Sequence, residues 1–345
     1  MARIALDAMG GDFAPRAPVA GALQALRASD GDLAIQLVGR TTAITTELDS
    51  LLKGEMAADA KHRDRIEIVE APEVIEMSDK PSAVIRGKPN NSMSAGLKLQ
   101  LESRSDAFVS AGNTGAQMAA SAMLLKLHPG LTRPAIATAF PTRRQPVVVL
   151  DAGANVDCSA RELLQFAWLG AVYAESVLGR ANPAVGLLSI GEEAEKGNAV
   201  VKEANAVFAS AGFNFVGNVE GRDLPAGECA RGPIDVVVCD GFVGNVVLKF
   251  YEGVMPMVLE VLQQNGIDRA QLKDVIRTFD SSEYGGAPLL GVKGISMICH
   301  GNSSPRAIAN AIKAAARAAG SGMNAQIGER LAALANGSSA SGAAA

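Results

Sequence analysis

The chain has few aromatic side chains, which make up 4% of its 345 residues, and it carries no excess of basic ones. Its formal net charge is −4, so the field of the whole molecule gives no reason to expect nucleic acid as a partner. Apolar residues nevertheless make up 48% of the chain. This composition is typical of a well-buried core in a chain long enough for one large domain or two of ordinary size.

The sequence lacks the cysteine spacings that bind metals or form disulfide frameworks. Its four cysteines show no CxxC or Cys/His pattern, and two of them lie in apolar runs typical of buried strands. We therefore expect four reduced thiols in a cytosolic protein. The cysteines are Cys158, Cys229, Cys239 and Cys299.

Signatures of covalent and nucleotide-dependent chemistry are also missing. The chain has no GxSxG elbow, no GxxxxGK[ST] loop and no GxGxxG after its first strand. Asp7, Asp12, Asp151 and Asp240 could collect around Mg²⁺, but their spacing does not require a metal. We therefore predict neither a metal nor a cofactor.

Membrane-spanning and secretory segments are not predicted. No apolar run approaches the roughly 18 residues that a spanning helix needs, and Asp7 interrupts the N-terminal apolar stretch before a signal peptide could form. The last residues, 331–345, are mostly small and polar and predict a disordered tail.

Short apolar runs alternate with helix-like segments along the first 330 residues. Several runs are continuous in Val, Ile and Leu, as in strands of a parallel sheet that is buried on both faces. The alternation predicts an α/β fold with an open, mostly parallel sheet, in one two-lobed domain over 1–330. The expected strands are 3–7, 33–38, 65–69, 106–110, 135–140, 146–151, 184–190, 213–217, 235–240 and 294–300, and the helix-like segments include 18–29, 114–127, 161–178 and 305–319.

Six of these strands run directly into polar, glycine-rich loops. Because the carboxyl ends of parallel strands lie along one edge of a sheet, we expect the six loops to build one site. Glycines that merely turn the chain from strand to helix are the alternative for any single loop. The loops are "DAMGGD", "SAGNTGA", "DAGAN", "IGEEAEKGN", "DGFVGN" and "HGNSS", and their supporting residues are Asp7, Gly10, Gly11, Asp12, Asp151, Asn155, Asp240 and Asn245.

The loop "SAGNTGA" has no large side chain, and a predicted helix follows it. Bare backbone at a helix N-terminus lets N–H groups approach an anion closely, so we predict a phosphate or carboxylate site there. A tight packing turn with Thr114 as the N-cap is the alternative. The predicted phosphate-binding residues are Ser110, Gly112, Asn113, Thr114 and Gly115.

Lys196 and His300 are the strongest single candidates for chemistry. Lys196 follows a buried strand in a loop with three glutamates, and lysine pairs well with phosphate. His300 is the one histidine at a predicted strand end, where it could donate to a developing negative charge or move a proton. A solvated charged loop and a structural histidine are the respective alternatives.

Taken together, these segments resemble the PlsX-type phosphate acyltransferases. They occur in order and at suitable spacing from about residue 3 to about residue 320, and eight in register are far more specific than any one of them. The matching segments are "DAMGGDFAP", "SAGNTGA", "RPAIA", "LDAGAN", "SIGEEAEKGN", "CDGFVGNVVLK", "YGGAPLLGVKG" and "HGNSS".

The resemblance implies a Rossmann-like three-layer α/β/α sandwich, related to isopropylmalate dehydrogenases, that acts as a homodimer. It implies transfer of a fatty acyl group from acyl-acyl carrier protein to inorganic phosphate, and the acyl phosphate feeds phosphatidic acid and phospholipid synthesis. The segment 244–279 would form a protruding helical pair for dimerisation. Some family members touch the membrane with the tip of this region, but here the tip, "LQQNGIDRAQ", is short and polar. We expect a cytoplasmic protein and leave open peripheral contact with the inner face of the membrane.

The residues are sufficient for this chemistry. Phosphate is already an oxyanion and a thiol leaves readily, with a pKa of about 8.5, so neither an enzyme nucleophile nor a strong acid is needed. We assign phosphate binding to the loop 110–115 and Lys196, and oxyanion donation to Asn113, Asn198 or His300. Asp7 and Asp12 would orient neighbouring donors, since like charges repel.

An acidic carrier protein requires a local basic face. Two clusters could supply it, although scattered surface charge is the alternative for each. The first contains Arg133, Arg143 and Arg144, and the second contains Arg86 and Lys88.

Three other functions stay open on the sequence. A short-chain phosphotransacylase would use acyl-coenzyme A as its donor. An assay that compares acyl-coenzyme A with acyl-carrier protein as donor would distinguish it from the enzyme that the resemblance implies. A nicotinamide-dependent dehydrogenase of the isopropylmalate type lacks its cofactor fingerprint here, and a phosphate-sensing protein would bind without turnover.

Overall fold

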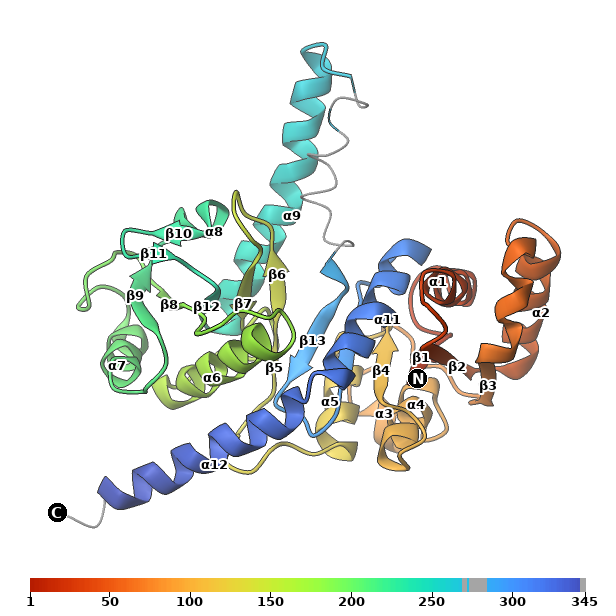
Figure 1. Cartoon of the computed structure of the whole chain (residues 1–345), viewed down its shortest axis with the longest axis horizontal. Coiled ribbons are helices and arrows are strands. Elements are labelled where there is room, and N and C mark those ends of the chain that lie inside the picture. The colour runs from red at the N-terminus through yellow and green to blue at the C-terminus, as the bar shows by residue number, and fades with distance from the viewer. Residues whose placement is uncertain (269–271, 273–283, 342–345) are drawn as a thin grey trace. The chain divides into compact units, whose positions relative to one another are not determined.

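The computed structural model describes residues 1–268, 272 and 284–341, and the chain divides into two compact units (Figure 1). Unit 1 comprises Met1–His128 and Tyr284–Asn324, and unit 2 comprises Pro129–Glu283 and Ala325–Ala345. The predicted α/β architecture with mostly parallel strands is confirmed. The strands are divided between two main sheets, however, where the sequence predicts one.

The main strands of unit 1 follow the order β3-β2-β1-β4-β14-β13. All of these neighbours pair in parallel except β13, which is antiparallel to β14. Helices α1 and α11 pack together on one side of the sheet, and α4 lies on the other (Figure 1). The elements are β1 (Ala2–Asp7), α1 (Arg16–Arg27), β2 (Leu33–Gly39), α2 (Thr41–Lys53), the 3₁₀ helix η1 (Ala57–Arg65), β3 (Ile66–Glu70), α3 (Ala83–Arg86), α4 (Ser92–Leu101), β4 (Ala107–Ser110), α5 (Thr114–Leu124), β13 (Ala287–Leu290), β14 (Ser296–Ile298) and α11 (Pro305–Gly320).

Unit 2 is built on a second sheet with the order β6-β7-β12-β8-β9, in which β6 is antiparallel to β7 and the other neighbours are parallel. The elements are β5 (Ala135–Ile136), β6 (Thr138–Phe140), β7 (Val147–Leu150), α6 (Ala160–Ser176), β8 (Val185–Leu188), α7 (Ala199–Phe208), β9 (Phe215–Val219), α8 (Asp223–Ala226), β10 (Glu228–Cys229), β11 (Gly232–Pro233), β12 (Val236–Val238), α9 (Gly241–Gln264) and α12 (Met323–Ser341).

The valines of the continuous apolar runs in unit 2 pack on both faces of its sheet. Val147 and Val149 lie in a buried cluster against which Tyr251 of α9 packs. On α6, a Cβ at Gly170 would lie 2.6 Å from Val236 Cγ1 and 2.8 Å from Leu150 Cδ1. Because successive strand residues point to opposite faces, a strand covered on both sides must be apolar throughout.

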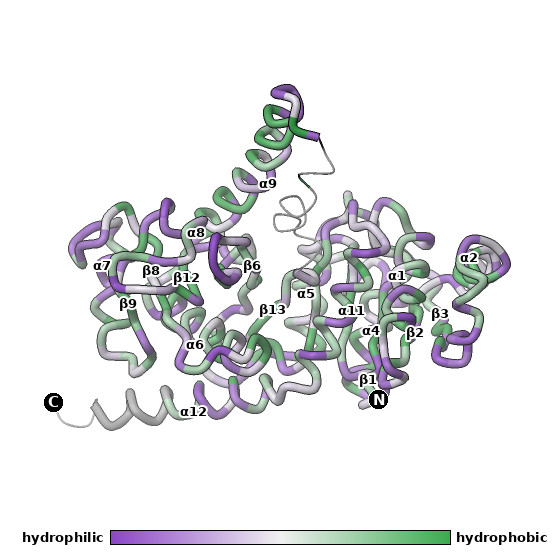
Figure 2. Tube along the Cα trace, turned by 45° about the horizontal axis from the view of Figure 1, so that its top comes forward, coloured by the Kyte–Doolittle hydropathy of each residue, from purple (hydrophilic) through white to green (hydrophobic). Residues whose placement is uncertain are grey.

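Helix α9 is rich in apolar side chains, yet several of them are exposed. Figure 2 shows hydrophobic residues distributed along it. The exposed fractions of Phe250, Met257 and Val261 are 71%, 57% and 51%. Within the described residues this one helix is long and apolar enough, by length and composition alone, to cross a membrane. Of the helical pair predicted over 244–279, α9 supplies the first helix, and most of the rest, residues 269–271 and 273–279, lies outside the described residues.

The C-terminal segment differs from the predicted disordered tail. Helix α12 runs from Met323 to Ser341, and residues 342–345 lie outside the described part. Its Ala- and Leu-rich stretch before Asn336 has strong intrinsic helix propensity, which the composition of the last residues obscures. Arg330 also lies over the ring of Trp168 on α6, 5.4 Å from its centroid.

Two helical glycines give opposite expectations for stability. A Cβ at Gly21 would lie 2.6 Å from Ile308 Cβ and 2.8 Å from the Pro305 carbonyl oxygen, whereas one at Gly253 would meet nothing within 4 Å. Gly21→Ala should lower the free energy of unfolding by about 1–3 kcal/mol through overpacking. Gly253→Ala should raise it by about 0.5–1 kcal/mol through helix propensity. Urea midpoints check both, and a shift of the same sign in the two variants would contradict the close α1–α11 packing.

Candidate functional site

The loops after β1, β4 and β14 lie at one edge of the unit 1 sheet, as predicted. β4 pairs in parallel with both other strands, so their carboxyl ends are adjacent. These ends lead to Asp7, Ser110 and His300. Asp12 N donates to the Gly301 carbonyl oxygen at 2.8 Å, which ties the first loop to the third.

Asp7 connects the first loop to the second. Ser110 Oγ donates to Asp7 Oδ2 at 2.7 Å, and Gly112 N donates to Ser110 Oγ at 3.0 Å. Met9 N donates to Asp7 Oδ1 at 3.1 Å. The Asp7 carboxylate is 1% exposed, so it faces these donors rather than solvent.

Burial raises the pKa of Asp7 above its ordinary value, and the hydrogen bonds that the carboxylate accepts lower it by less. The donors include Ser92, at the start of α4, which the sequence analysis did not identify. Its only sequence signal was a small polar residue in "NNSMSAG", a segment far from any predicted strand end.

The loops after β1 and β4 pack closely at two glycines. A Cβ at Gly10 would lie 2.6 Å from Asp7 Oδ2 and 2.8 Å from Gly112 N. A Cβ at Gly112 would lie 2.5 Å from Met93 Cε. Gly10 has no room for a side chain, because backbone and a buried carboxylate lie there, whereas a Cβ at Gly112 would displace the flexible end of Met93.

Asn113, rather than Thr114, caps helix α5. Its Oδ1 accepts from Ala116 N at 3.0 Å, and its Nδ2 donates to three carbonyl oxygens of the segment 76–79. The Asn113 side chain is therefore occupied by structural contacts. In the part of the chain that the structure describes, no hydrogen bond uses the N–H groups of Thr114 and Gly115, as expected in the first turn of a helix. Thr114 is also exposed.

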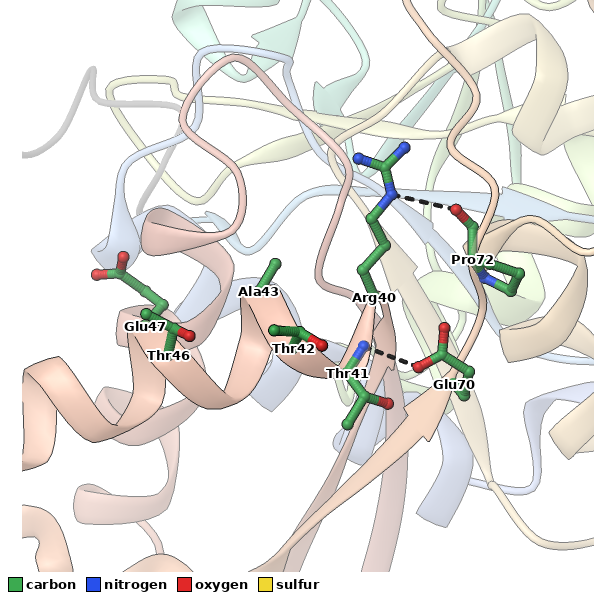
Figure 3. Close-up of a pocket in the computed structure, with 8 residues that line it drawn as sticks. All are labelled: Arg40, Thr41, Thr42, Ala43, Thr46, Glu47, Glu70 and Pro72. Carbon is green, nitrogen blue, oxygen red and sulfur yellow. Dashed lines mark hydrogen bonds between the residues drawn. The ribbon is translucent and has the colours of Figure 1, made fainter.

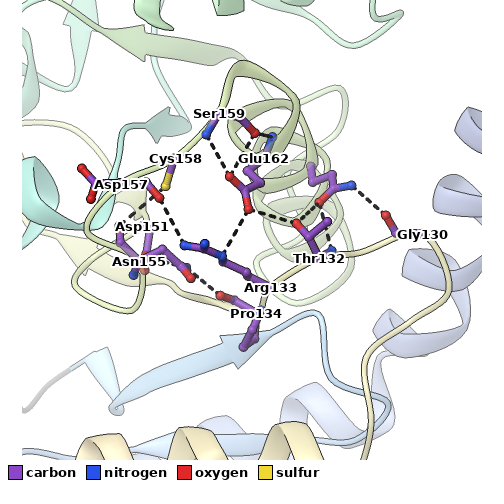
Figure 4. Close-up of polar contacts among 11 residues, drawn as sticks. Gly130, Thr132, Arg133, Pro134, Asp151, Asn155, Asp157, Cys158, Ser159 and Glu162 are labelled. Atoms are coloured by element: carbon purple, nitrogen blue, oxygen red, sulfur yellow. Dashed lines mark hydrogen bonds and ion pairs between the residues drawn. The ribbon is translucent and has the colours of Figure 1, made fainter.

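In unit 2, Asp151 follows β7 and is fully buried. Its Oδ1 accepts from Ile136 N at 3.0 Å and Ala154 N at 3.2 Å. Its Oδ2 accepts from Asn155 N at 2.6 Å and Asn155 Nδ2 at 2.9 Å (Figure 4). Burial raises the pKa of Asp151, and these hydrogen bonds lower it by less.

The loop after β12 packs directly on this carboxylate. A Cβ at Gly241 would lie 2.7 Å from Asp151 Oδ2, and Gly241 N donates to the Asn155 carbonyl oxygen at 2.7 Å. Asp240 caps α9 by accepting from Val243 N at 2.8 Å. Asn245, one turn later, lies against Gly153.

Lys196 lies in the loop after β8 and lines a hollow of about 600 Å³. Its stem packs over Gly191, where a Cβ would lie 2.9 Å from Lys196 Cγ. Its ammonium group makes no hydrogen bond or ion pair with the described residues. Arg222 and Arg231 line the same hollow with three glutamates, Glu192, Glu193 and Glu220, so its basic and acidic groups are equal in number. Arg222 pairs with Glu192 and Glu220, which leaves Lys196 as a cation without an ion pair to the described residues.

Asn198 caps helix α7. Its Oδ1 accepts from Val201 N at 2.9 Å. Its side-chain amide nitrogen makes no hydrogen bond with a described residue, so unlike that of Asn113 it has a donor to spare.

The prediction that all six loops follow one sheet edge is wrong. Three loops belong to the unit 1 sheet and three to the unit 2 sheet. The phosphate loop 110–115 and Lys196 are therefore in different units. The sequence pattern marked the end of each strand correctly, but it could not assign strands to sheets, because pairing is a tertiary property.

Three of the predicted carrier-binding cations form ion pairs with carboxylates of the same chain. Arg133 pairs with Glu162 at 3.2 Å (Figure 4), Arg144 pairs with Glu228 at 2.6 Å, and Lys88 pairs with Asp79 at 2.5 Å. Each of these charges is partly neutralised by its partner, which weakens both predicted clusters.

The cysteines are free thiols. Burial raises the pKa of Cys158 and Cys299 to about 12, so both are protonated at neutral pH and are poor nucleophiles. Over the described residues, no group of three or more His, Cys, Asp or Glu side chains is arranged to hold a metal ion.

The sequence matches a family model described as a fatty acid synthesis protein over residues 2–326. It is 48% identical over 324 residues to a protein named phosphate acyltransferase from Heliobacterium modesticaldum, covering 91% of this chain and 92% of that protein. A phosphate acyltransferase from Desulforamulus reducens is 45% identical over 344 residues, covering 96% and 98%.

Solved phosphotransacetylase structures share the fold. A EutD phosphotransacetylase from Staphylococcus aureus superposes with a TM-score of 0.60 at 16% identity, covering 92% of this chain and 94% of that chain. A phosphotransacetylase from Streptococcus pyogenes gives a TM-score of 0.61 at 17% identity, again covering 92% and 94%. At these identities the likeness concerns the fold alone.

The Asp151 cluster predicts a stability difference between two similar substitutions. Both Asp151 oxygens accept two N–H donors, so Asp151→Asn must turn an NH₂ group toward donors and should cost about 1–3 kcal/mol. Asp240→Asn keeps an equally good N-cap and should change stability little. Thermal or urea unfolding compares them, and equal stabilities would contradict the role given to Asp151.

Proposed function

The chain belongs to the phosphate acyltransferase family, and from that membership we propose that its donor is a long-chain acyl-acyl carrier protein and its acceptor inorganic phosphate. The reaction transfers the acyl group to phosphate and yields an acyl phosphate for phospholipid synthesis. The observation that carries the proposal is the bare first turn of α5, where the N–H groups of Thr114 and Gly115 are unused beside an exposed hydroxyl.

The proposed reaction needs positioning more than acid–base chemistry. A phosphate oxygen attacks the thioester carbonyl, a C–O bond forms, the C–S bond breaks, and the carrier thiolate takes up a proton. The thiol, with a pKa of about 8.5, is a fair leaving group, so charge stabilisation at the tetrahedral oxyanion is the main requirement.

We propose different roles for the predicted site residues, and the contacts of Ser110 and Asp7 support the division. Thr114 and Gly115 would bind phosphate directly. Ser110 would instead position the loop, because its hydroxyl hydrogen goes to Asp7. From the sequence alone we further propose that Lys196 adds positive charge and that His300 or the Asn198 amide donates to the oxyanion. His300 is in unit 1 with the loop 110–115, and Lys196 and Asn198 are in unit 2. Asp7 would orient the loop, in line with its burial.

Helix α9 supports the proposal of a homodimer. Several of its apolar side chains are more than half exposed, including Val246, Phe250 and Met257. An exposed apolar stripe of this kind marks a surface that another molecule covers. We propose that a second copy covers it and that the enzyme works in the cytoplasm, with peripheral membrane contact as the competing use of the same stripe.

A short-chain phosphotransacylase that uses acyl-coenzyme A is the alternative function. The phosphotransacetylase fold and the same reaction type favour it. Turnover with acyl-coenzyme A but not with acyl-carrier protein would establish that alternative.

Lys196→Ala should raise the KM for phosphate about tenfold or more, because each factor of ten corresponds to about 1.4 kcal/mol and a lysine–phosphate contact is charge-assisted. Phosphate-dependent release of carrier thiol measures this. Lys202→Ala, on the exposed surface of α7, is the matched control. An unchanged KM for phosphate in Lys196→Ala would remove this lysine from the site.

Carrier docking is expected beside α8. Arg143 N donates to the Pro225 carbonyl oxygen, so the exposed Arg143 lies beside this helix. Arg222 directly precedes the helix, but it pairs with Glu192 and Glu220, so Arg143 is the residue tested. Arg143→Glu should raise the KM for acyl-carrier protein several-fold and make it less sensitive to salt. Arg144→Gln, whose guanidinium already pairs with Glu228, should have a smaller effect. A KM that is unchanged and independent of salt in Arg143→Glu would exclude this face.

A further inference from the structure

A groove of about 750 Å³ lies along helix α1 within unit 1. Figure 1 shows α1 with α11 on one side and α2 on the other. The volume is in the range of sites that hold small molecules. Its apolar lining consists of Phe13, Ala14, Ala17, Ala20, Met56 and Pro305.

The groove is continuous with the loops of the candidate site. Phe13 and Ala14 directly follow Asp12, whose N–H donates to the Gly301 carbonyl oxygen. A Cβ at Gly11 would lie 3.2 Å from Ala111 Cβ, beside the phosphate loop. The two loops that border the groove, 11–14 and 301–304, therefore touch each other, and the first of them touches the phosphate loop.

The charged groups that line the groove are already paired. Arg16 holds Glu47 at 2.7 Å and Glu55 at 2.8 Å, and Arg27 holds the buried carboxylate of Asp59. Paired charges offer little to an anion. The groove therefore fits an uncharged, apolar occupant better than a phosphate or a nucleotide.

The shape of the groove also suits a chain. Ala17, Ala20, Gln24 and Arg27 line it at helical spacing. Ala17 and Arg27 are ten residue steps apart, which corresponds to about 15 Å of helix at 1.5 Å per residue. The α1 wall is small and apolar at Ala17 and Ala20 and becomes polar at Gln24 and Arg27, while Asn302 and Ser304 add polar groups at the end next to the loop after β14.

We propose that this groove binds the fatty acyl chain of the thioester donor, with the carbonyl end at the phosphate loop and the methyl end toward Gln24. The inference rests on the proposed function and adds a binding site to it. The polar far end then limits the chain length, because methylene groups placed beside Gln24 and Arg27 gain little from leaving water.

The test compares octanoyl- and palmitoyl-carrier protein as donors in the phosphate-dependent thiol-release assay. Gln24→Trp, at a half-buried position, fills the far half of the groove and should lower kcat/KM for the palmitoyl donor about tenfold, leaving the octanoyl donor unchanged. Gln24→Leu makes the same wall apolar and should shift the preference the opposite way, so the two variants together separate a specific effect from misfolding.

The matched control is Thr46→Trp on α2. Thr46 is exposed and lines a different hollow of about 600 Å³, together with Arg40, Thr41 and Glu70 (Figure 3). This variant should leave the chain-length profile unchanged.

Normal turnover with identical chain-length profiles in all variants would overturn the inference and leave the proposed function standing. Equal losses for both donors would assign the groove to a shared part of the donor and would also overturn it. Absence of phosphate-dependent turnover in the unsubstituted protein would overturn the proposed function, and this inference with it.

Discussion

Each unit depends on one buried carboxylate at the end of a buried strand. Asp7 in unit 1 and Asp151 in unit 2 are 1% and 0% exposed, and both accept hydrogen bonds from loops that arrive from elsewhere in the chain. A buried carboxylate without partners costs several kcal/mol, so these donors must stay in place whenever the unit is folded. The two aspartates thereby fix the loops around them and leave glycine as the residue that fits against their oxygens.

This constraint explains how a site with few reactive side chains can be catalytic. The buried thiols are protonated, and the acceptor phosphate brings its own negative charge. The protein has to hold that anion beside a thioester and present rigid donors. The loop anchored by Asp7 and Ser110 leaves unused N–H groups at the start of α5, and we propose that these bind the anion.

The sequence predicted where the strands lie better than it predicted how they pair into sheets. Each of the ten predicted strands overlaps an observed one, because buried parallel strands are continuous apolar runs. β13 was missed, since "APLL" is short, contains proline and lies between glycines. The division into two sheets was missed for a different reason: local patterns do not encode which strands pair. For the same reason Ser92 could not be recognised, since it donates to Asp7 from the start of a helix that is distant in sequence. The side-chain amide of Asn113 was predicted to contact the ligand, whereas in the fold it caps α5 and donates to the segment 76–79.

The most direct test of the account is a crystal structure determined with inorganic phosphate bound. We expect the ion within hydrogen-bond distance of the N–H groups of Thr114 and Gly115, with the Asp7–Ser110 hydrogen bond intact behind it. An ordered phosphate bound elsewhere, with the first turn of α5 empty, would contradict the central claim.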